Sequence, residues 1–205
     1  AEPLLREVLE AIRETLGNRH LNTLISINNL GNLLQAKGDL AAAELLYREA
    51  LEGRRETLGN RHPHTLTSIN NLGVLLKVKG DLAAAEPLYR EALEVRRETL
   101  GNRHPHTLAS IGNFGDLLQA KSDLTAAEPL YREALEVARE TLGNRHPLTL
   151  GSIDNLGSLL QDKGDLAAAE LLLREALEVS RETLGDRHPD TLGSMRNLGK
   201  MLRVK

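Results

Sequence analysis

The sequence predicts an all-α protein built as one continuous array of tandem repeats. The string Thr-Leu-Gly-Asn-Arg-His, with Asp for Asn in the last copy, begins at Thr15, Thr57, Thr99, Thr141 and Thr183. Successive copies start 42 residues apart (57−15, 99−57, 141−99, 183−141), so one supersecondary unit has been copied head to tail. Hydrophobic residues make up 40% of the chain but aromatic residues only 2%, so the core must consist of Leu, Ile, Val and Ala, which favours helices.

The repeat divides the 205 residues into units that pack on their neighbours, and no linker is expected. The predicted boundaries are a half unit at 1–19, full units at 20–61, 62–103, 104–145 and 146–187, and a half unit at 188–205. The first residues match residues 86–91, from the interior of a unit. We therefore expect the sequence to be a piece of a longer array.

The unit 62–103 shows how each repeat is expected to begin. Pro63 suits the first position of a helix, because the N–H that proline lacks has no partner there. Apolar residues follow at spacings of three and four, namely Leu66, Ile69, Leu72, Leu75 and Leu76. This pattern predicts an amphipathic helix of about 16 residues, called helix A. Gly80 is expected to end it.

A second helix, called helix B, is predicted from Leu82 to about Leu100, with Asp81 as its cap. Pro87 should bend or delay this helix, because proline removes a backbone hydrogen bond. Gly73, in the middle of helix A, costs roughly 1 kcal/mol relative to alanine. We expect the compensation to be close packing of helix A against the small side chains of Ala85 and Ala92. Charged neighbours along helix B, such as Arg90 and Glu94, are interpreted as a solvated surface.

These residues carry a family resemblance. The pattern Asn71-Leu72-Gly73, Leu75-Leu76, Lys79-Gly80-Asp81, Ala85 and Tyr89-Arg90-Glu91-Ala92-Leu93 resembles the tetratricopeptide repeat. The family unit usually has 34 residues, and the longer unit here is similar to the 42-residue repeats of kinesin light chains. The resemblance implies a right-handed α-solenoid, a superhelix of antiparallel helix pairs. Its A helices would line a concave groove that binds a peptide or helix of a partner protein, so the chain is expected to be a scaffold.

One asparagine per unit forms a column on the predicted groove face, at Asn29, Asn71, Asn113, Asn155 and Asn197. A side-chain amide can both donate to and accept from a peptide backbone, so the column suits binding of an extended chain. The alternative interpretation is structural, with each asparagine hydrogen-bonded to the neighbouring unit.

Beside this column the copies differ from one another more than they do at core positions. One row consists of Asn28, Asn70, Gly112, Asp154 and Arg196; the others include Val74, Asp116 and Lys200, and Lys77, Gln119, Gln161 and Arg203. Variation of this kind indicates recognition, although solvent-facing positions also drift without function. The rows are acidic at Asp116 and Asp154 and basic in the last unit, so a partner's acidic end is expected to lie toward the C-terminus.

Composition excludes several classes of function. With 26 basic and 29 acidic residues the net charge is −3, so neither nucleic acid nor an anionic membrane is an expected partner. Cysteine is absent, which excludes disulfides, thiolate metal sites and cysteine nucleophiles. No apolar stretch approaches the roughly 18 residues of a membrane span, and no signal-peptide pattern is present, so an intracellular, cytoplasmic location is expected.

The histidines and other polar residues predict neither an enzyme, a metal site nor a cofactor. His62 and His64 have a spacing that some metal sites use, and His104 and His106 repeat it. A histidine recurs at each start of helix A, however, where its ring can cap or pack the loop. The remaining Ser, His and Asp residues are spread evenly by the repeat and form no unique polar cluster.

A rival hypothesis is a structural or consensus-like engineered array with no evolved ligand. Units 62–103 and 104–145 differ at only nine of 42 positions, few for units that recognise distinct ligands. Such an array could also associate end to end in open fibres through uncovered apolar faces. The expected faces consist of Leu4, Leu5, Val8, Leu9 and Ile12 at one end and Leu192, Met195, Leu198 and Leu202 at the other.

Overall fold

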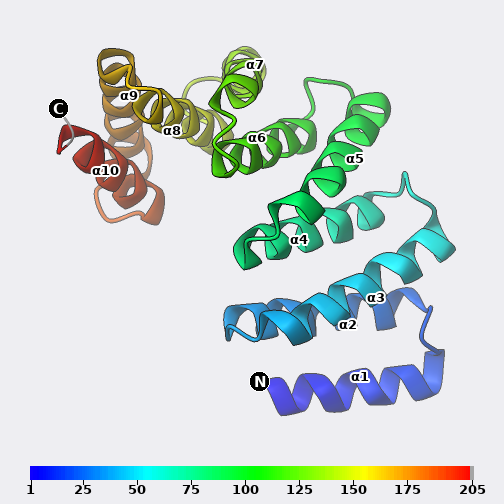
Figure 1. Cartoon of the computed structure of the whole chain (residues 1–205). Coiled ribbons are helices and arrows are strands. Elements are labelled where there is room, and N and C mark those ends of the chain that lie inside the picture. The colour runs from blue at the N-terminus through cyan, green and yellow to red at the C-terminus, as the bar shows by residue number, and fades with distance from the viewer. Residues whose placement is uncertain (204–205) are drawn as a thin grey trace. The chain divides into compact units, whose positions relative to one another are not determined.

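The computed structural model describes residues 1–203; Val204 and Lys205, at the end of the last predicted half unit, lie outside the described residues. Within residues 1–203 every regular element is an α-helix, and no strand is present (Figure 1). The A helices are α2 (Leu21–Ala36), α4 (Pro63–Lys79), α6 (Pro105–Ala120), α8 (Pro147–Asp162) and α10 (Pro189–Leu202). The B helices are α1 (Glu2–Leu16), α3 (Leu40–Leu58), α5 (Leu82–Leu100), α7 (Leu124–Leu142) and α9 (Leu166–Leu184). The predicted all-α class is confirmed.

The chain divides into two compact parts, Ala1–Val95 and Arg96–Lys205, called the N-terminal and the C-terminal part. In the N-terminal part α2 packs against both α1 and α3, and α3 also packs against α4. In the C-terminal part α6 packs on α7, α7 on α8, α8 on α9 and α9 on α10. Three residues, 37–39, join α2 to α3, so the two helices of this pair run antiparallel.

Each A helix begins at a histidine that caps it. The Nδ1 atom of His62 accepts a hydrogen bond from the backbone N–H of His64 at 3.1 Å, and His104 accepts one from His106 in the same way. The recurring histidine thus satisfies one of the N–H groups that a helix start leaves without a partner. The cap interpretation of this residue is confirmed.

The starts of the B helices confirm the cap and test whether Pro87 delays helix B; the structure leaves the predicted bend a prediction. Asp81 accepts a hydrogen bond from the backbone N–H of Ala84 at 3.1 Å, as a cap should. Pro87 does not delay α5, which begins at Leu82 and continues through the proline to Leu100. The cap fixes the first turn before the proline is reached. The equivalent helix α9 has Leu171 in the proline position and begins at the equivalent residue, Leu166.

Close packing around the mid-helix glycines is confirmed, and the nearest contact is a tyrosine of helix B that the sequence analysis did not name as the partner. A Cβ added to Gly73 would lie 3.1 Å from Cε1 of Tyr89, and one added to Gly115 would lie 2.5 Å from Cε1 of Tyr131. The tyrosine rings are buried. Each glycine therefore makes room for a large ring from helix B, and not for the alanine methyl groups alone.

Candidate functional site

Asn71, the second residue of the asparagine column, makes a hydrogen bond within the protein. Asn71 on α4 donates from Nδ2 to Oδ1 of Asn28 on α2 at 2.9 Å. Asn28 is buried and Asn71 is half-buried. Because these helices belong to successive repeats, this bond joins one repeat to the next, as the structural interpretation of the column expects.

The equivalent positions in the C-terminal part make different contacts. Opposite Asn155 stands Gly112, whose added Cβ would lie 3.8 Å from Asn155 Nδ2, so the equivalent partner amide is missing. At the next rung Asp154 accepts a hydrogen bond from Ser194 Oγ at 2.8 Å. Burial raises the pKa of the Asp154 carboxyl above its ordinary value and Asp190 raises it further, although hydrogen bonds from Ser194 and Asn197 act in the opposite direction.

The other predicted binding residues lie on the A helices at different depths. Exposed side chains are those of Asn29, Arg196, Lys200 and Arg203. Half-buried side chains are those of Asn70, Asn113, Asn155, Asn197, Asp154, Val74, Asp116, Lys77, Gln119 and Gln161. Their assignment to partner binding stays a prediction.

Two of the predicted rows meet at a tyrosine that sequence reasoning did not single out as functional. Tyr131 on α7 donates from its hydroxyl to Asp116 Oδ1 at 2.6 Å, and Gln119 Oε1 lies 3.1 Å from the same hydroxyl. Gln119 in turn donates from Nε2 to Asp162 Oδ2 on α8 at 2.6 Å. Burial and the adjacent Asp116 raise the pKa of Tyr131. The tyrosine therefore orders polar side chains on the face where a partner is expected.

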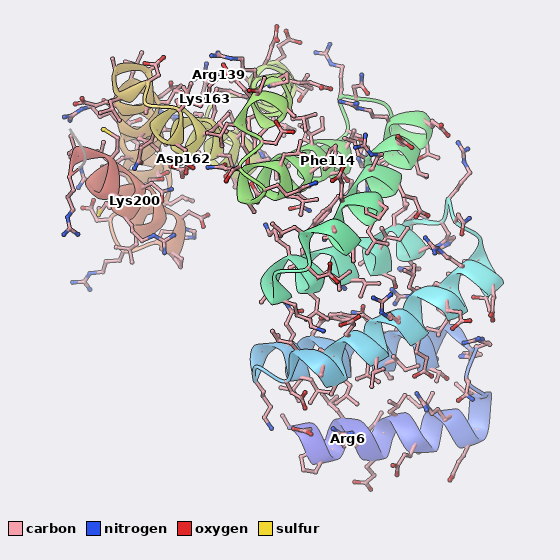
Figure 2. All side chains as sticks on the ribbon, viewed as in Figure 1. Arg6, Phe114, Arg139, Asp162, Lys163 and Lys200 are labelled. Carbon is pink, nitrogen blue, oxygen red and sulfur yellow. The ribbon has the colours of Figure 1, made fainter. Side chains whose placement is uncertain are left out.

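The outer face of the B helices carries a ladder of ion pairs between successive repeats. Each rung joins an arginine to a glutamate 36 residues later, in the pairs Arg13–Glu49, Arg55–Glu91, Arg97–Glu133 and Arg139–Glu175. In each pair one arginine Nη2 contacts both carboxylate oxygens at 2.6–2.8 Å; Arg139 is labelled in Figure 2. Pairs of residues close in sequence give no sign of this ladder. The only signal in the sequence is that an arginine is followed by a glutamate 36 residues later in each repeat.

Charged pairs also form within one helix, on the surface that the sequence predicts to be solvated. Arg90 donates to Glu86, one turn before it, at 2.8 Å. In the preceding repeat Glu44 binds both Arg48 and Lys79 of the next repeat, and these hydrogen bonds hold the pKa of its carboxyl below the ordinary value. The exposed face of helix B thus carries ion pairs within one repeat and between successive repeats.

The expected apolar end faces are only partly uncovered. Leu4 is 63% exposed and Leu192 is 52% exposed, as predicted for uncovered residues. Leu9 and Leu198 are buried, however, and the prediction was wrong for these two. Both lie on the side of their helix that packs against the neighbouring helix, so they belong to the core.

Two further observations concern ligands and membranes. Among residues 1–203 no group of three or more His, Asp or Glu side chains is placed to hold a metal ion. The rings of His62 and His64 lie 5.2 Å apart, and His62 serves as a helix cap. In the same described part of the chain, no helix combines the length and the apolar character that crossing a membrane requires.

Comparisons with solved structures agree with this architecture. A structure from Podosopora anserina, described as kinesin light chain-like nearly identical TPR-like repeats, is 26% identical, with a TM-score of 0.75 and coverage of 90% of this chain and 87% of that one. A single-substitution variant of that protein is 25% identical, with a TM-score of 0.76 and coverage of 88% and 85%. BtubC (BKLC) from P. vanneervenii shares the fold at 23% identity, with a TM-score of 0.80 and coverage of 98% and 82%. No curated protein matches the sequence.

Family models agree as well. Residues 46–98, 64–140, 112–181 and 148–203 match a model described as tetratricopeptide repeat, and residues 23–64 match a second model with the same description. Together these matches extend over residues 23–203, far more than half of the chain. The chain belongs to the tetratricopeptide repeat family, and its repeats are similar to those of kinesin light chain-like proteins.

Proposed function

We propose that this chain is a protein-interaction scaffold that binds a peptide or helix of a partner on the groove face of its A helices, the face that carries the asparagine column. Tetratricopeptide repeats in general mediate protein–protein interactions. The observation that carries the proposal for this chain is the contrast between the two helix faces. The repeats keep the same charged residues on the B helices and vary on the A helices.

The ion-pair ladder supports this division of the surface. Arg97 and Arg139 each bind a glutamate of the next repeat, so the recurring pattern on the B helices has a structural cause. The contacts at the varied A-helix positions, by contrast, differ from one repeat to the next, as Asn28–Asn71 and Asp154–Ser194 show. Gln161 is half-buried and Lys200 is exposed at positions where the repeats differ, which suits contacts to a ligand.

A structural array with no evolved ligand is the second candidate, and one observation favours it. Asn71 donates to Asn28 of the preceding repeat, so at this rung the column stabilises the array itself. The experiment must therefore distinguish side chains that are available to a ligand from side chains that form hydrogen bonds between repeats.

Selection of random linear peptides on the whole chain tests the proposal. The A-face variant carries Asn155→Ala, Gln161→Ala and Lys200→Ala, which remove side chains at predicted binding positions. The control variant carries Glu94→Ala, Glu136→Ala and Glu178→Ala, which remove three equivalent exposed side chains from the B helices. Circular dichroism confirms that both variants remain folded before selection.

The two hypotheses predict different outcomes. Binding to an A-helix face predicts peptides that bind the parent and the control variant but bind the A-face variant at least tenfold more weakly. If no peptide is enriched, or if the A-face variant retains the enriched peptides, the proposal is wrong and the structural array is the better account.

A further inference from the structure

A buried arginine occupies the junction between successive repeats in the N-terminal part. Arg54, near the end of α3, is 3% exposed. Its Nη1 atom donates to the backbone oxygen of His64 at 3.1 Å and to Ser68 Oγ at 2.7 Å, both on α4. This junction, formed by helix B and the start of the next helix A, thus accommodates a guanidinium group.

The equivalent junction in the last repeat is open. The residue 126 positions after Arg54 (54+126) is Ser180, on α9. Two other side chains are also lost, because Gly151 and Gly193 stand at the positions equivalent to Ile25 and Thr67. A Cβ added to either glycine would meet nothing within 4 Å. These differences leave a crevice of about 350 Å³ between α8, α9 and α10, lined by Ser180 and both glycines.

The crevice contains a buried hydroxyl group without a hydrogen-bond partner. Ser180 is fully buried, and its Oγ has no hydrogen-bond partner within residues 1–203. Asp154 also lines the crevice, where its carboxyl group accepts hydrogen bonds from Ser194 and Asn197. A buried polar atom that lacks a partner costs stability, so a ligand that donates hydrogen bonds would bind favourably here.

The crevice also carries negative charge that the filled junction lacks. Asp154 and Asp190 both line it, and their equivalents in the N-terminal part are Asn28 and His64. The basic Arg196 lines one side of the crevice and is exposed to solvent. Two carboxylates have thus been added at the junction from which the protein's own arginine has been lost.

We propose that this crevice binds the arginine side chain of a partner protein. The inference rests on the proposed scaffold function in one respect, namely that the arginine belongs to a partner protein. A guanidinium group suits the crevice better than an ammonium group, because its planar array presents five N–H donors in several directions to a lining that includes Asp154, Ser180 and Ser194. The precedent lies in the same chain, where Arg54 binds Ser68, the equivalent of Ser194.

Nuclear magnetic resonance of the ¹⁵N-labelled full chain tests the ligand chemistry directly. The probe is N-acetylarginine methylamide, and the matched controls are the same derivatives of citrulline, which is neutral, and of lysine. We expect the arginine compound to shift the amide resonances of residues that line the crevice, Gly151, Ser180 and Gly193 among them. The citrulline compound should bind at least tenfold more weakly, because it forms no charge-assisted hydrogen bonds. Equal binding of arginine and citrulline, or shifts distributed over the whole surface, would overturn the proposal.

Three variants locate the site. Ser180→Arg places the protein's own guanidinium in the crevice, as at Arg54, and should abolish binding of the probe. Asp154→Asn removes the charge and should weaken binding about tenfold. Glu178→Gln removes one charge from an exposed position on α9 and should leave binding unchanged. Unchanged binding in both Ser180→Arg and Asp154→Asn contradicts the proposal.

The outcome is separable from that of the peptide selection. One outcome is that selected peptides bind the A helices without shifting the amide resonances of the crevice residues. In that case the scaffold proposal stands and the arginine site is wrong. If the arginine compound binds the crevice while no peptide is enriched, the site stands and the scaffold proposal fails.

Discussion

Ser122 adopts a left-handed backbone conformation, with φ of 62°, at a position where other repeats have glycine. The equivalent residues Gly38, Gly80 and Gly164 have φ of 84–85°. This conformation costs an L-residue with a side chain roughly 1–2 kcal/mol, whereas glycine adopts it freely. One repeat therefore carries local strain that its neighbours avoid.

Replacement of Ser122 by glycine should stabilise the chain. We expect Ser122→Gly to raise the free energy of unfolding by about 0.5–1 kcal/mol, since relief of strain exceeds the added entropy of the unfolded chain. Urea unfolding measures the change. The converse substitution, Gly164→Ser, should lower the free energy of unfolding by a similar amount, and equal stability of all three proteins would contradict the strain argument.

The Asp154 carboxyl should make the stability of the fold depend on pH. Burial raises its pKa in the folded chain, so the ionised carboxylate destabilises the fold at neutral pH. Stability from this group is therefore greatest below the ordinary carboxyl pKa and is lost as the pH rises through the folded value. We expect Asp154→Asn to raise the melting temperature at pH 7, with a gain that shrinks toward about pH 4.

Thermal melting at both pH values gives the measurement. Asp162→Asn is the matched control, because Asp162 is an exposed carboxylate on the same helix α8. The gain from Asp154→Asn should exceed that of the control at pH 7 and approach it near pH 4. A gain that is equal at the two pH values would show that charge burial is not its cause.

At the scale of the helical element, glycine decides how closely a pair of helices packs. A Cβ at Gly115 on α6 would lie 2.5 Å from the buried ring of Tyr131 on α7, a separation that real Cβ atoms do not tolerate. A Cβ at Gly199 on α10 would meet nothing within 4 Å. The packing of the neighbouring helix thus requires glycine at position 115 but does not require it at position 199.

Alanine substitution distinguishes these two glycines. Gly115→Ala should lower the free energy of unfolding by about 1 kcal/mol, because overpacking against the ring outweighs the gain in helix propensity. Gly199→Ala should raise it by up to about 1 kcal/mol, since only the propensity changes. Urea unfolding of the two variants gives the comparison, and changes of the same sign would contradict it.

At the scale of the whole molecule, the repeats are held together by contacts that recur from one interface to the next. The Arg–Glu ladder recurs unchanged in both parts of the chain, as in Arg55–Glu91 and Arg139–Glu175. The amide ladder does not, because Gly112 interrupts it opposite Asn155. Since the stability of a repeat array depends on such nearest-neighbour contacts, the interface of α6 and α8 should be weaker for this reason.

Restoring the missing amide tests this view of the interfaces. Gly112→Asn should form the equivalent of the Asn28–Asn71 hydrogen bond and should also improve helix propensity. Gly151→Asn, at an exposed position on α8, improves propensity alone. We expect the first variant to be more stable than the second by about 1 kcal/mol in urea unfolding. Equal gains would place Asn155 outside the interface contacts and return it to the candidates for partner binding.

Much of the architecture could be derived from the sequence because its signals are local. The constant spacing of 42, the apolar pattern that includes Leu66 and Ile69, and the glycine at position 80 predict where each helix begins, which side it buries and where it ends. These properties depend on backbone preferences and on residues within one or two turns, so neighbouring residues suffice to predict them.

Tertiary structure alone decided which residues meet across repeats. The bond from Asn71 to Asn28, the 36-residue ion pairs and the ring of Tyr89 against Gly73 depend on how separate helices pack. The crevice beside Ser180 is also of this kind, because it is formed by side chains that are absent from three different helices. Helical periodicity determines which face a residue occupies, but packing between repeats determines what that residue touches.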